Sequence, residues 1–419
     1  MYFVGTRKDK EAGNIMQKLA DLMQTLNVES FPERWEIFYD NVMKEYDTNG
    51  CIYTNPLYYE EINRKYNCLD KYLDVYMKAA EKIDKDEFLS RYLMLLCYAI
   101  KDRNNFKDDL KNLDMPKPKD GSYSFEYEIM PGLAIASMSG YMYDNMKKRG
   151  IPDNIICETV ASQQCGIKEY RRRNNGKDGY LHFGWNQLYI DGELFRIGSL
   201  EYQINHRFIG KCRIFEDKNK NLTALAHDIT LHKNGYELGS KYFEDKEGSY
   251  EAYITETDKS YEGYPFDDNG YAKDDRILLL KSEWTPVMQK DDYAVSVHIP
   301  SETDFTPEAV DKSISEAKDF LAKYYPEYKY RAFVCISWLM DSALPNILKP
   351  DSNIVSFNKR FRKITTLSYG EGVLEFVFLK NAKEAVIAEL PENTGLEKTL
   401  KNYYLSGKVI YEMIGYFIN

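Results

Sequence analysis

The sequence predicts a protein of mixed class, α/β or α+β, in which a helical N-terminal part precedes a part that contains a sheet. Two observations support this prediction. From residue 14 to residue 110, apolar side chains recur at the three- and four-residue spacing of helices. From residue 180 the spacing changes to two, as strands require, and helical stretches then alternate with further strands.

The length of the chain predicts the number of domains, and its net charge excludes some classes of partner. The chain has 419 residues, which is too many for one small core, so we expect two domains. Its net charge is −10. Because nucleic acids and anionic lipids both attract basic surfaces, we expect neither a nucleic acid nor a membrane as a partner.

The cysteines predict a reducing compartment. There are seven, an odd number, no Cys-x-x-Cys occurs, and several lie in apolar runs such as YLMLLCYAI. This pattern is typical of buried thiols and favours neither a disulfide framework nor a zinc site. The first residues, MYFVGTRKDK, lack the apolar stretch of a signal peptide. We therefore expect a cytoplasmic protein without a metal site.

The helical part contains several amphipathic stretches, followed by a break. Helices are predicted at 14–28, 68–83, 84–100, 131–150 (starting at Pro131) and 151–176. The Pro- and Lys-rich stretch 111–122 interrupts them and predicts a domain boundary. The expected division is a helical domain at 1–120 and a second domain at 121–419, with helices at 128–176 and a mixed sheet at 180–419.

The stretch LHFGWNQLYIDGELFRIGSLEYQI, residues 181–204, reads as a hairpin turning at Asp191-Gly192. That register would place His182 opposite Glu201. A carboxylate beside an imidazole can hold one tautomer and raise the basicity of the ring, so the pair is a candidate for general base catalysis. The alternative is a solvated cross-strand pair without a catalytic role.

Beyond the hairpin, predicted strands alternate with predicted helices. Strands are expected within 211–232 and at 276–284, 293–300, 330–340, 364–369, 373–379 and 409–418, and helices at 306–325, 352–361 and 396–407. In AVSVHIPSETDFTPEAV a strand leads through a loop into a helix that Thr306 would cap and Pro307 would begin. The free N–H groups of such a helix start can bind a phosphate; alternatively, the helix is simply well capped.

Other motifs carry less information. The segment 243–270 mixes carboxylates with tyrosines, which would suit a glycosidase or sugar-binding surface but also a solvated insert. No Gly-x-Ser-x-Gly, P-loop or Gly-x-Gly-x-x-Gly occurs between a strand and a helix. The sequence therefore favours none of the commonest hydrolase, NTPase or dinucleotide-binding classes.

Five segments, in their order and spacing, resemble a known family: WNQLYIDGELFRIGSLEY, EGYPFDDNG, VSVHIP, CISWLMDSAL and SNIVSFNKRF. The family consists of bacterial acyltransferase-domain proteins with a helical N-acyltransferase N-terminal domain and a GNAT-like C-terminal domain. The resemblance covers 121–419, with weaker support from the helical first third. It implies an α+β fold in which the helical N-terminal domain is followed by a GNAT-like mixed α/β domain with a splayed central sheet.

The resemblance also implies a function. It implies an N-acyltransferase that uses acyl-CoA, acetyl-CoA or a longer thioester, without a metal, to acylate a small-molecule amine or a peptide. Its central strand would be 294–299, the splayed partner 332–339 and the phosphate loop 301–306. His298, Glu201 and His182 would be catalytic. The implied cofactor-binding residues are Val297, Ile299, Ser301, Thr303, Thr306, Ser337, Ser352 and Asn353. The tyrosine acid that such enzymes often carry after the splayed strand is missing from SWLMDSALPNILKPDSN, so the leaving thiolate would need another proton donor, such as Ser337 or Ser352.

The sequence departs from the family pattern at the phosphate loop. The usual Gln/Arg-x-x-Gly-x-Gly/Ala is replaced by SETDFT, which carries two acidic residues. The alternative function is therefore a catalytically inactive GNAT-like scaffold that binds a small ligand or a partner protein. No oligomeric state follows from the sequence.

Overall fold

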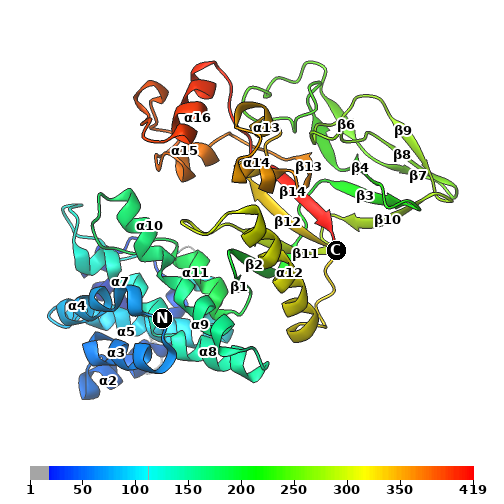
Figure 1. Cartoon of the computed structure of the whole chain (residues 1–419). Coiled ribbons are helices and arrows are strands. Elements are labelled where there is room, and N and C mark those ends of the chain that lie inside the picture. The colour runs from blue at the N-terminus through cyan, green and yellow to red at the C-terminus, as the bar shows by residue number, and fades with distance from the viewer. Residues whose placement is uncertain (1–17, 112) are drawn as a thin grey trace, which may run out of the picture. The chain divides into compact units, whose positions relative to one another are not determined.

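The structure is a computed structural model that describes residues 18–111 and 113–419 (Figure 1). The chain divides into two compact units, Met1–Phe195 and Arg196–Asn419. The first is helical, and the second is built around sheets, so the α+β class with a helical N-terminal part is confirmed. The domain division at residue 120 stays a prediction, since one compact unit can hold more than one domain.

The first unit is a bundle of short helices. A helix covers residues 18–25, and residues 14–17 of the predicted first helix lie outside the described residues. The others are α2 (Glu36–Asn49), α3 (Pro56–Tyr66), α4 (Leu73–Ile83), α5 (Glu87–Lys101), α6 (Arg103–Phe106), α7 (Phe125–Ala136), α8 (Ser139–Lys148), α9 (Asp153–Ala161), α10 (Cys165–Arg173) and α11 (Phe183–Ile190).

Helix α5 is the centre of this bundle. Its sequence EFLSRYLMLLCYAIK is apolar on nearly every face, and most of its residues from Leu89 to Ile100 are buried. Asp86 caps its start, because the carboxylate accepts hydrogen bonds from the backbone N–H groups of Phe88 and Leu89, both at 3.0 Å. Helices α2 and α7 pack against it.

One predicted helix start is wrong. Pro131 lies inside α7 and not at its first residue, since the helix begins at Phe125. A proline inside a helix has no backbone N–H to donate, so one helical hydrogen bond is lost and the helix is destabilised. Burial outweighs that cost here, because the residues from Ile129 to Ala136 are all buried.

The predicted hairpin at 181–204 is also wrong in its first half. Residues Phe183–Ile190 form helix α11, and Asp191 ends that helix. The two strands are instead β1 (Leu194–Ile197) and β2 (Leu200–Arg207), which turn at Gly198, where φ is 59°. An eight-residue apolar run is compatible with helix or strand, so its contacts decide between them.

The second unit is organised by a six-stranded sheet with the order β1-β2-β11-β12-β14-β13. Its later strands are β11 (Tyr293–His298), β12 (Ala332–Ser337), β13 (Arg362–Thr365) and β14 (Met413–Ile418). Strands β11 and β12 are parallel, and the pairs β2–β11, β12–β14 and β13–β14 are antiparallel. The crossover between β11 and β12 is helix α12 (Pro307–Tyr324).

Both faces of this sheet are covered. On one face lies α12, whose Ser313 hydroxyl is 2.9 Å from the Tyr202 hydroxyl on β2. On the other lies a three-stranded sheet of β3 (Cys212–Asp217), β4 (Leu222–Ala226) and β10 (Trp284–Gln289). The core between these two sheets includes Cys212, Ile214, Ala224 and Met288 from the smaller sheet and Ala294, Val334, Ile364 and Ile414 from the larger one.

Smaller elements complete the second unit. They are β5 (Ile229–Leu231), β6 (Tyr250–Ala252), β7 (Thr255–Glu256), β8 (Ser260–Gly263), β9 (Ile277–Leu280), the 3-10 helices η6 (Trp338–Met340) and η7 (Ile387–Glu389), α13 (Leu344–Ile347), α14 (Asn353–Asn358), α15 (Gly372–Phe376) and α16 (Gly395–Leu405). The predicted strand 373–379 is wrong, because α15 occupies most of it. In the part of the chain that the structure describes, no helix has the length and apolarity needed to cross a bilayer.

Candidate active site

The central parallel strands separate at their C-terminal ends. Only two residue pairs join β11 to β12, Val295 with Phe333 and Ser296 with Val334. Both strands continue further, β11 to His298 and β12 to Ser337. A gap therefore opens between 297–298 and 335–337, and it is called the β11–β12 gap below. The predicted splay of the central sheet is confirmed.

Each of the two strands that border this gap is paired with another strand on its other side. Strand β11 stays paired with β2 as far as His298, which lies opposite Glu201. Strand β12 stays paired with β14 as far as Ser337, which lies opposite Met413. Because each wall is fixed by its other neighbour, the gap is a feature of the sheet and not of a frayed strand end.

His298 lies at the end of the gap wall. Its Nε2 atom is 3.3 Å from the Oε1 atom of Gln203, which lies two residues beyond Glu201 on β2. Burial of the ring and, to a smaller extent, the nearby His206 lower the pKa of His298 to about 4. The imidazole is therefore neutral at neutral pH and has a nitrogen that can accept a proton.

The loop that follows β11 is fixed to the β1–β2 turn. The Thr303 hydroxyl donates a hydrogen bond to the carbonyl oxygen of Ser199. It also accepts one from the Arg196 guanidinium at 2.9 Å, and Arg196 donates to the carbonyl oxygen of Gly198 at 2.8 Å. Arg196 also lies 3.9 Å from Glu201. The loop conformation is thus determined by a side chain at the start of the second unit.

Thr306 and Pro307 begin α12, as the sequence predicts. The Thr306 hydroxyl does not cap the helix; it donates to Asp304 at 2.8 Å. Hydrogen bonds from the backbone and side chain of Thr306 lower the pKa of Asp304. The Arg360 guanidinium lies at the same helix start, 3.2 Å from the Pro307 carbonyl oxygen. The helix start therefore presents backbone donors with one acidic and one basic side chain nearby.

These features match a known family. Residues 194–417, more than half of the chain, match the family described as the GNAT-like C-terminal domain. The chain belongs to this family. Two solved structures share the fold over 95% of this chain and 98% of theirs, each with a TM-score of 0.61. One is an acyltransferase in complex with decanoyl-CoA and teicoplanin, at 17% identity, and the other a mutant acyltransferase in complex with octanoyl-CoA, at 16%. No curated protein is similar to the chain in sequence.

One predicted pair in this GNAT-like sheet is not formed. His182 was expected opposite Glu201, but it precedes helix α11 and adopts a left-handed conformation with φ at 63°. Glu201 is instead the register partner of His298. The error follows from the first half of the predicted hairpin, because residues in a helix cannot keep a cross-strand register.

The other predicted binding residues are distributed along the gap and beyond it. Val297 is buried within β11, whereas Ile299, Ser301 and Thr303 are partly exposed in the loop after it. The Ser337 hydroxyl accepts a hydrogen bond from Leu339 N–H at 3.1 Å, so it caps η6 and keeps its own proton to donate.

Ser352 lies at the start of α14 and accepts a hydrogen bond from Val355 N–H at 3.2 Å. Asn353, the first residue of α14, is exposed. Arg360, just past the end of α14, donates to the Ser356 carbonyl oxygen at 2.6 Å and to Asp311 on α12 at 2.7 Å. This arginine links α14 to the first turns of α12.

Sequence reasoning missed Gln203 and Arg196. Gln203 could have been found, because it lies two residues after Glu201 on a predicted strand, so that both side chains are on the same face. Arg196 carried no comparable signal, since its contact with Thr303 spans more than one hundred residues. Among the described residues, no group of three or more His, Cys, Asp or Glu side chains could hold a metal ion.

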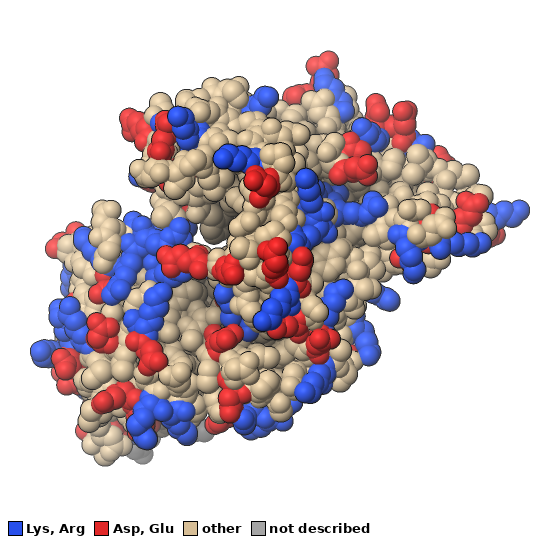
Figure 2. Space-filling view, viewed as in Figure 1, with Lys and Arg blue, Asp and Glu red and all other residues tan. Residues whose placement is uncertain are grey.

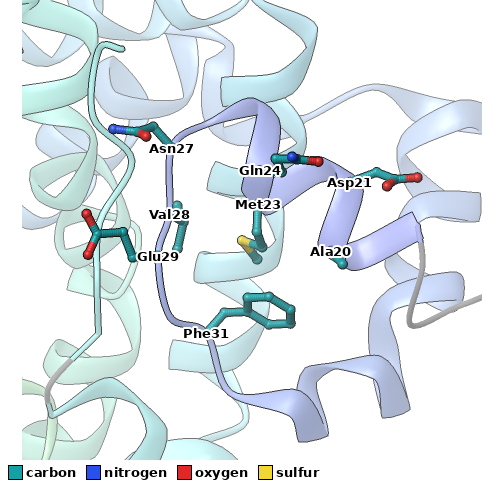
Figure 3. A pocket seen from close by; sticks show the side chains of 8 residues that line it. All are labelled: Ala20, Asp21, Met23, Gln24, Asn27, Val28, Glu29 and Phe31. Carbon is teal, nitrogen blue, oxygen red and sulfur yellow. The ribbon is translucent and has the colours of Figure 1, made fainter. Parts of the chain in front are cut away.

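The helical unit has a shallow pocket of about 350 Å³ (Figure 3). Its buried residues include Met23 and Val28, and its exposed residues include Asp21, Gln24 and Glu29. On the face shown in Figure 2, acidic and basic side chains are interspersed.

Proposed function

We propose that this GNAT-like protein transfers an acyl group from acyl-CoA to an amine. The observation that carries the proposal is the β11–β12 gap, where two parallel strands stop pairing while both continue. An extended thioester arm can lie in such a gap and pair with the free strand backbone, as an added strand does. The solved structures that share this fold were found with decanoyl-CoA or octanoyl-CoA, which supports the same co-substrate here.

The chemistry is direct transfer. The amine nitrogen attacks the thioester carbonyl carbon, a C–N bond forms and the C–S bond breaks. His298 is neutral, so it accepts the amine proton directly or through a water molecule. Backbone N–H groups at the gap stabilise the developing oxyanion. The Ser337 hydroxyl, at the end of the opposite wall, is our candidate for protonating the thiolate.

We propose a small-molecule amine or a peptide as the acceptor. One structure with this fold contains teicoplanin together with decanoyl-CoA, which supports a sizeable acceptor. All seven cysteines are free, and this supports a reducing compartment such as the cytoplasm.

Ligand-dependent stabilisation tests the proposal. We expect the melting temperature to rise with the concentration of acetyl-, octanoyl- or decanoyl-CoA, because a ligand that binds only the native state stabilises it. Free thiol released in the presence of an amine would then report turnover. If no CoA thioester at millimolar concentration shifts the melting temperature, the enzyme proposal fails and the scaffold alternative is favoured.

A matched pair of variants locates the site. Ser337→Trp places an indole at the open end of the gap and should abolish the shift caused by acyl-CoA. Ser406→Trp makes the same replacement at an exposed position after α16 and should leave the shift unchanged. Equal shifts in both variants would place the ligand elsewhere.

A further inference from the structure

The exposure of β12 changes abruptly where this strand stops pairing with β11. The residues from Ala332 to Cys335 are at most 1% exposed, whereas Ile336 is 37% exposed. The last residue of β12 that pairs with β11 is Val334. Strand β12 is an inner strand of the sheet, and Ile414, the partner of Ile336 on β14, is only 1% exposed. The exposure of Ile336 therefore arises on the side of the β11–β12 gap.

Ile336 lies on the face of the large sheet that packs against the smaller sheet. Its neighbours on this face are Val334, two residues earlier on β12, and its β14 partner Ile414. Both belong to the core between the two sheets. Alternate residues of a strand point to the same face, so Ile336 points to the face opposite α12.

His298 is on the same face and at the same level of the gap. The last pair of the two parallel strands is Ser296 with Val334. A step of two residues along each strand leads from this pair to His298 and Ile336. Ala294, four residues before His298 on β11, belongs to the core on this face. The imidazole and the Ile336 side chain thus border the gap from its two sides.

The opposite face of the gap is covered by α12. Val297 and Cys335 point to that face, and each is only 1% exposed. Tyr202, the β2 partner of Val297, contacts α12 through its hydroxyl. On the other face His298 is half-buried and Ile336 is exposed. A molecule from solvent therefore reaches the gap from the face that carries His298 and Ile336.

We propose that Ile336 is a specificity-determining residue that contacts the acyl acceptor beside its amine. An amine that passes a proton to His298 lies on the face of the sheet that carries this ring. Ile336 presents an apolar surface across the gap at the same level, and burial of apolar surface against it stabilises the bound acceptor. Preferred acceptors therefore carry an apolar group next to the amine. This inference rests on the proposed acyl transfer.

Two amines of equal length test the inference. Hexylamine is apolar beyond its nitrogen, whereas 2-(2-aminoethoxy)ethanol has oxygen atoms in a chain of the same length. With octanoyl-CoA as the donor, we expect the wild type to acylate hexylamine with the higher kcat/KM. Ile336→Thr keeps a β-branched side chain in the strand and should reduce this preference about tenfold. Ile336→Leu should retain the preference.

The matched control is Ile209→Thr. Ile209 is 48% exposed and lies just beyond Arg207, the end of β2 that is remote from the gap, so this variant should keep the wild-type preference. Equal preference in the wild type and both threonine variants would overturn the inference. Ile336→Thr could instead change the ratio of the rates with octanoyl-CoA and acetyl-CoA and leave the preference between the amines unchanged. That result would also overturn the inference, because Ile336 would then contact the acyl chain.

The two proposals fail separately. If amines are acylated but Ile336→Thr keeps the wild-type preference, acyl transfer stands and the role of Ile336 falls. If no CoA thioester binds, acyl transfer falls, and calorimetric titration of the full chain with hexylamine decides about Ile336. Weaker binding to Ile336→Thr than to Ile209→Thr would support an apolar contact at the gap. Absence of binding to the wild type, or equal binding to the two variants, would overturn it.

Discussion

Glu201 and His298 lie directly opposite each other on β2 and β11, at the end of the sheet where β11 parts from β12. Gln203 follows on the same face and contacts the imidazole. Because burial holds the pKa of His298 at about 4, the ring is neutral at neutral pH. A proton acceptor with two polar neighbours thus stands beside the gap.

Replacing His298 tests its role as the base. His298→Gln keeps a side chain that can form hydrogen bonds but cannot accept a proton at neutral pH, so we expect acyl transfer to fall about 100-fold while acyl-CoA affinity is kept. Thiol release under steady-state conditions measures the rate. His227→Gln, at the residue that follows β4 in the smaller sheet, is the control and should stay within a few-fold of the wild type. Equal rates in the two variants would exclude His298 as the base.

The stability of the protein should depend on the ionisation of Asp341. Burial raises the pKa of Asp341 to about 6, from 3.8. The folded state therefore binds this proton more tightly than the unfolded state, so between about pH 4 and pH 6 this group lowers the unfolding free energy as pH rises. The loss amounts to about 3 kcal/mol.

Urea unfolding of the wild type and of Asp341→Asn between pH 4 and pH 7 measures this effect. The variant has no proton to lose at this position, so the difference between the two unfolding free energies should change across this interval. Parallel pH profiles would show that the carboxylate is not desolvated.

Helix α16 should depend on its capping box. Thr394 accepts a hydrogen bond from Glu397 N–H at 3.1 Å, and Glu397 accepts one from Thr394 N–H at 2.8 Å. Thr394→Ala removes one of these bonds and should cost about 1 kcal/mol of unfolding free energy. Thr399→Ala makes the same replacement inside the helix and should be neutral or slightly stabilising. A similar loss in both variants would argue against the cap.

Gly415 on β14 has no room for a side chain. A Cβ atom at this position would lie 2.3 Å from the Met340 sulfur atom. Met340 is fully buried, so it cannot swing into solvent. Gly415→Ala should therefore destabilise the second unit by about 1–3 kcal/mol. The additional change Met340→Ala should cost less in the Gly415→Ala background than in the wild type, as a double-mutant cycle would show.

The spacing of apolar residues was sufficient to predict an element where the pattern fitted only a helix or only a strand. The eighteen-residue helix α12 begins at the predicted Thr306–Pro307 junction, and β11 follows the predicted alternation. It was insufficient for FGWNQLYI and VLEFVFL, two short apolar runs that strands and helices both accept. Asp191-Gly192 looks like a hairpin turn, but Asp191 ends α11 and pairs with Arg103 at 2.6 Å, a contact that local patterns do not contain.

The candidate site shows the same division. His298 and Thr306 lie at predictable positions, the end of a strand and the start of a helix. Glu201 was correctly selected as a polar residue of β2, but its partner was wrong because register depends on where the turn falls. The environment of Asp341 could not be foreseen, since Tyr411, which donates to it, is seventy residues away.

The two edge strands of the six-stranded sheet offer little backbone for pairing, in contrast to the gap inside it. Strands β1 and β13, at its two sides, have four residues each, and Thr365 N–H on β13 is already occupied by the Gly270 carbonyl oxygen at 2.8 Å. Short or occupied borders discourage pairing with a neighbouring molecule. The strand backbone that can still pair therefore lies at the gap inside the sheet and not at its edges. The same arrangement limits aggregation and allows an extended ligand to bind.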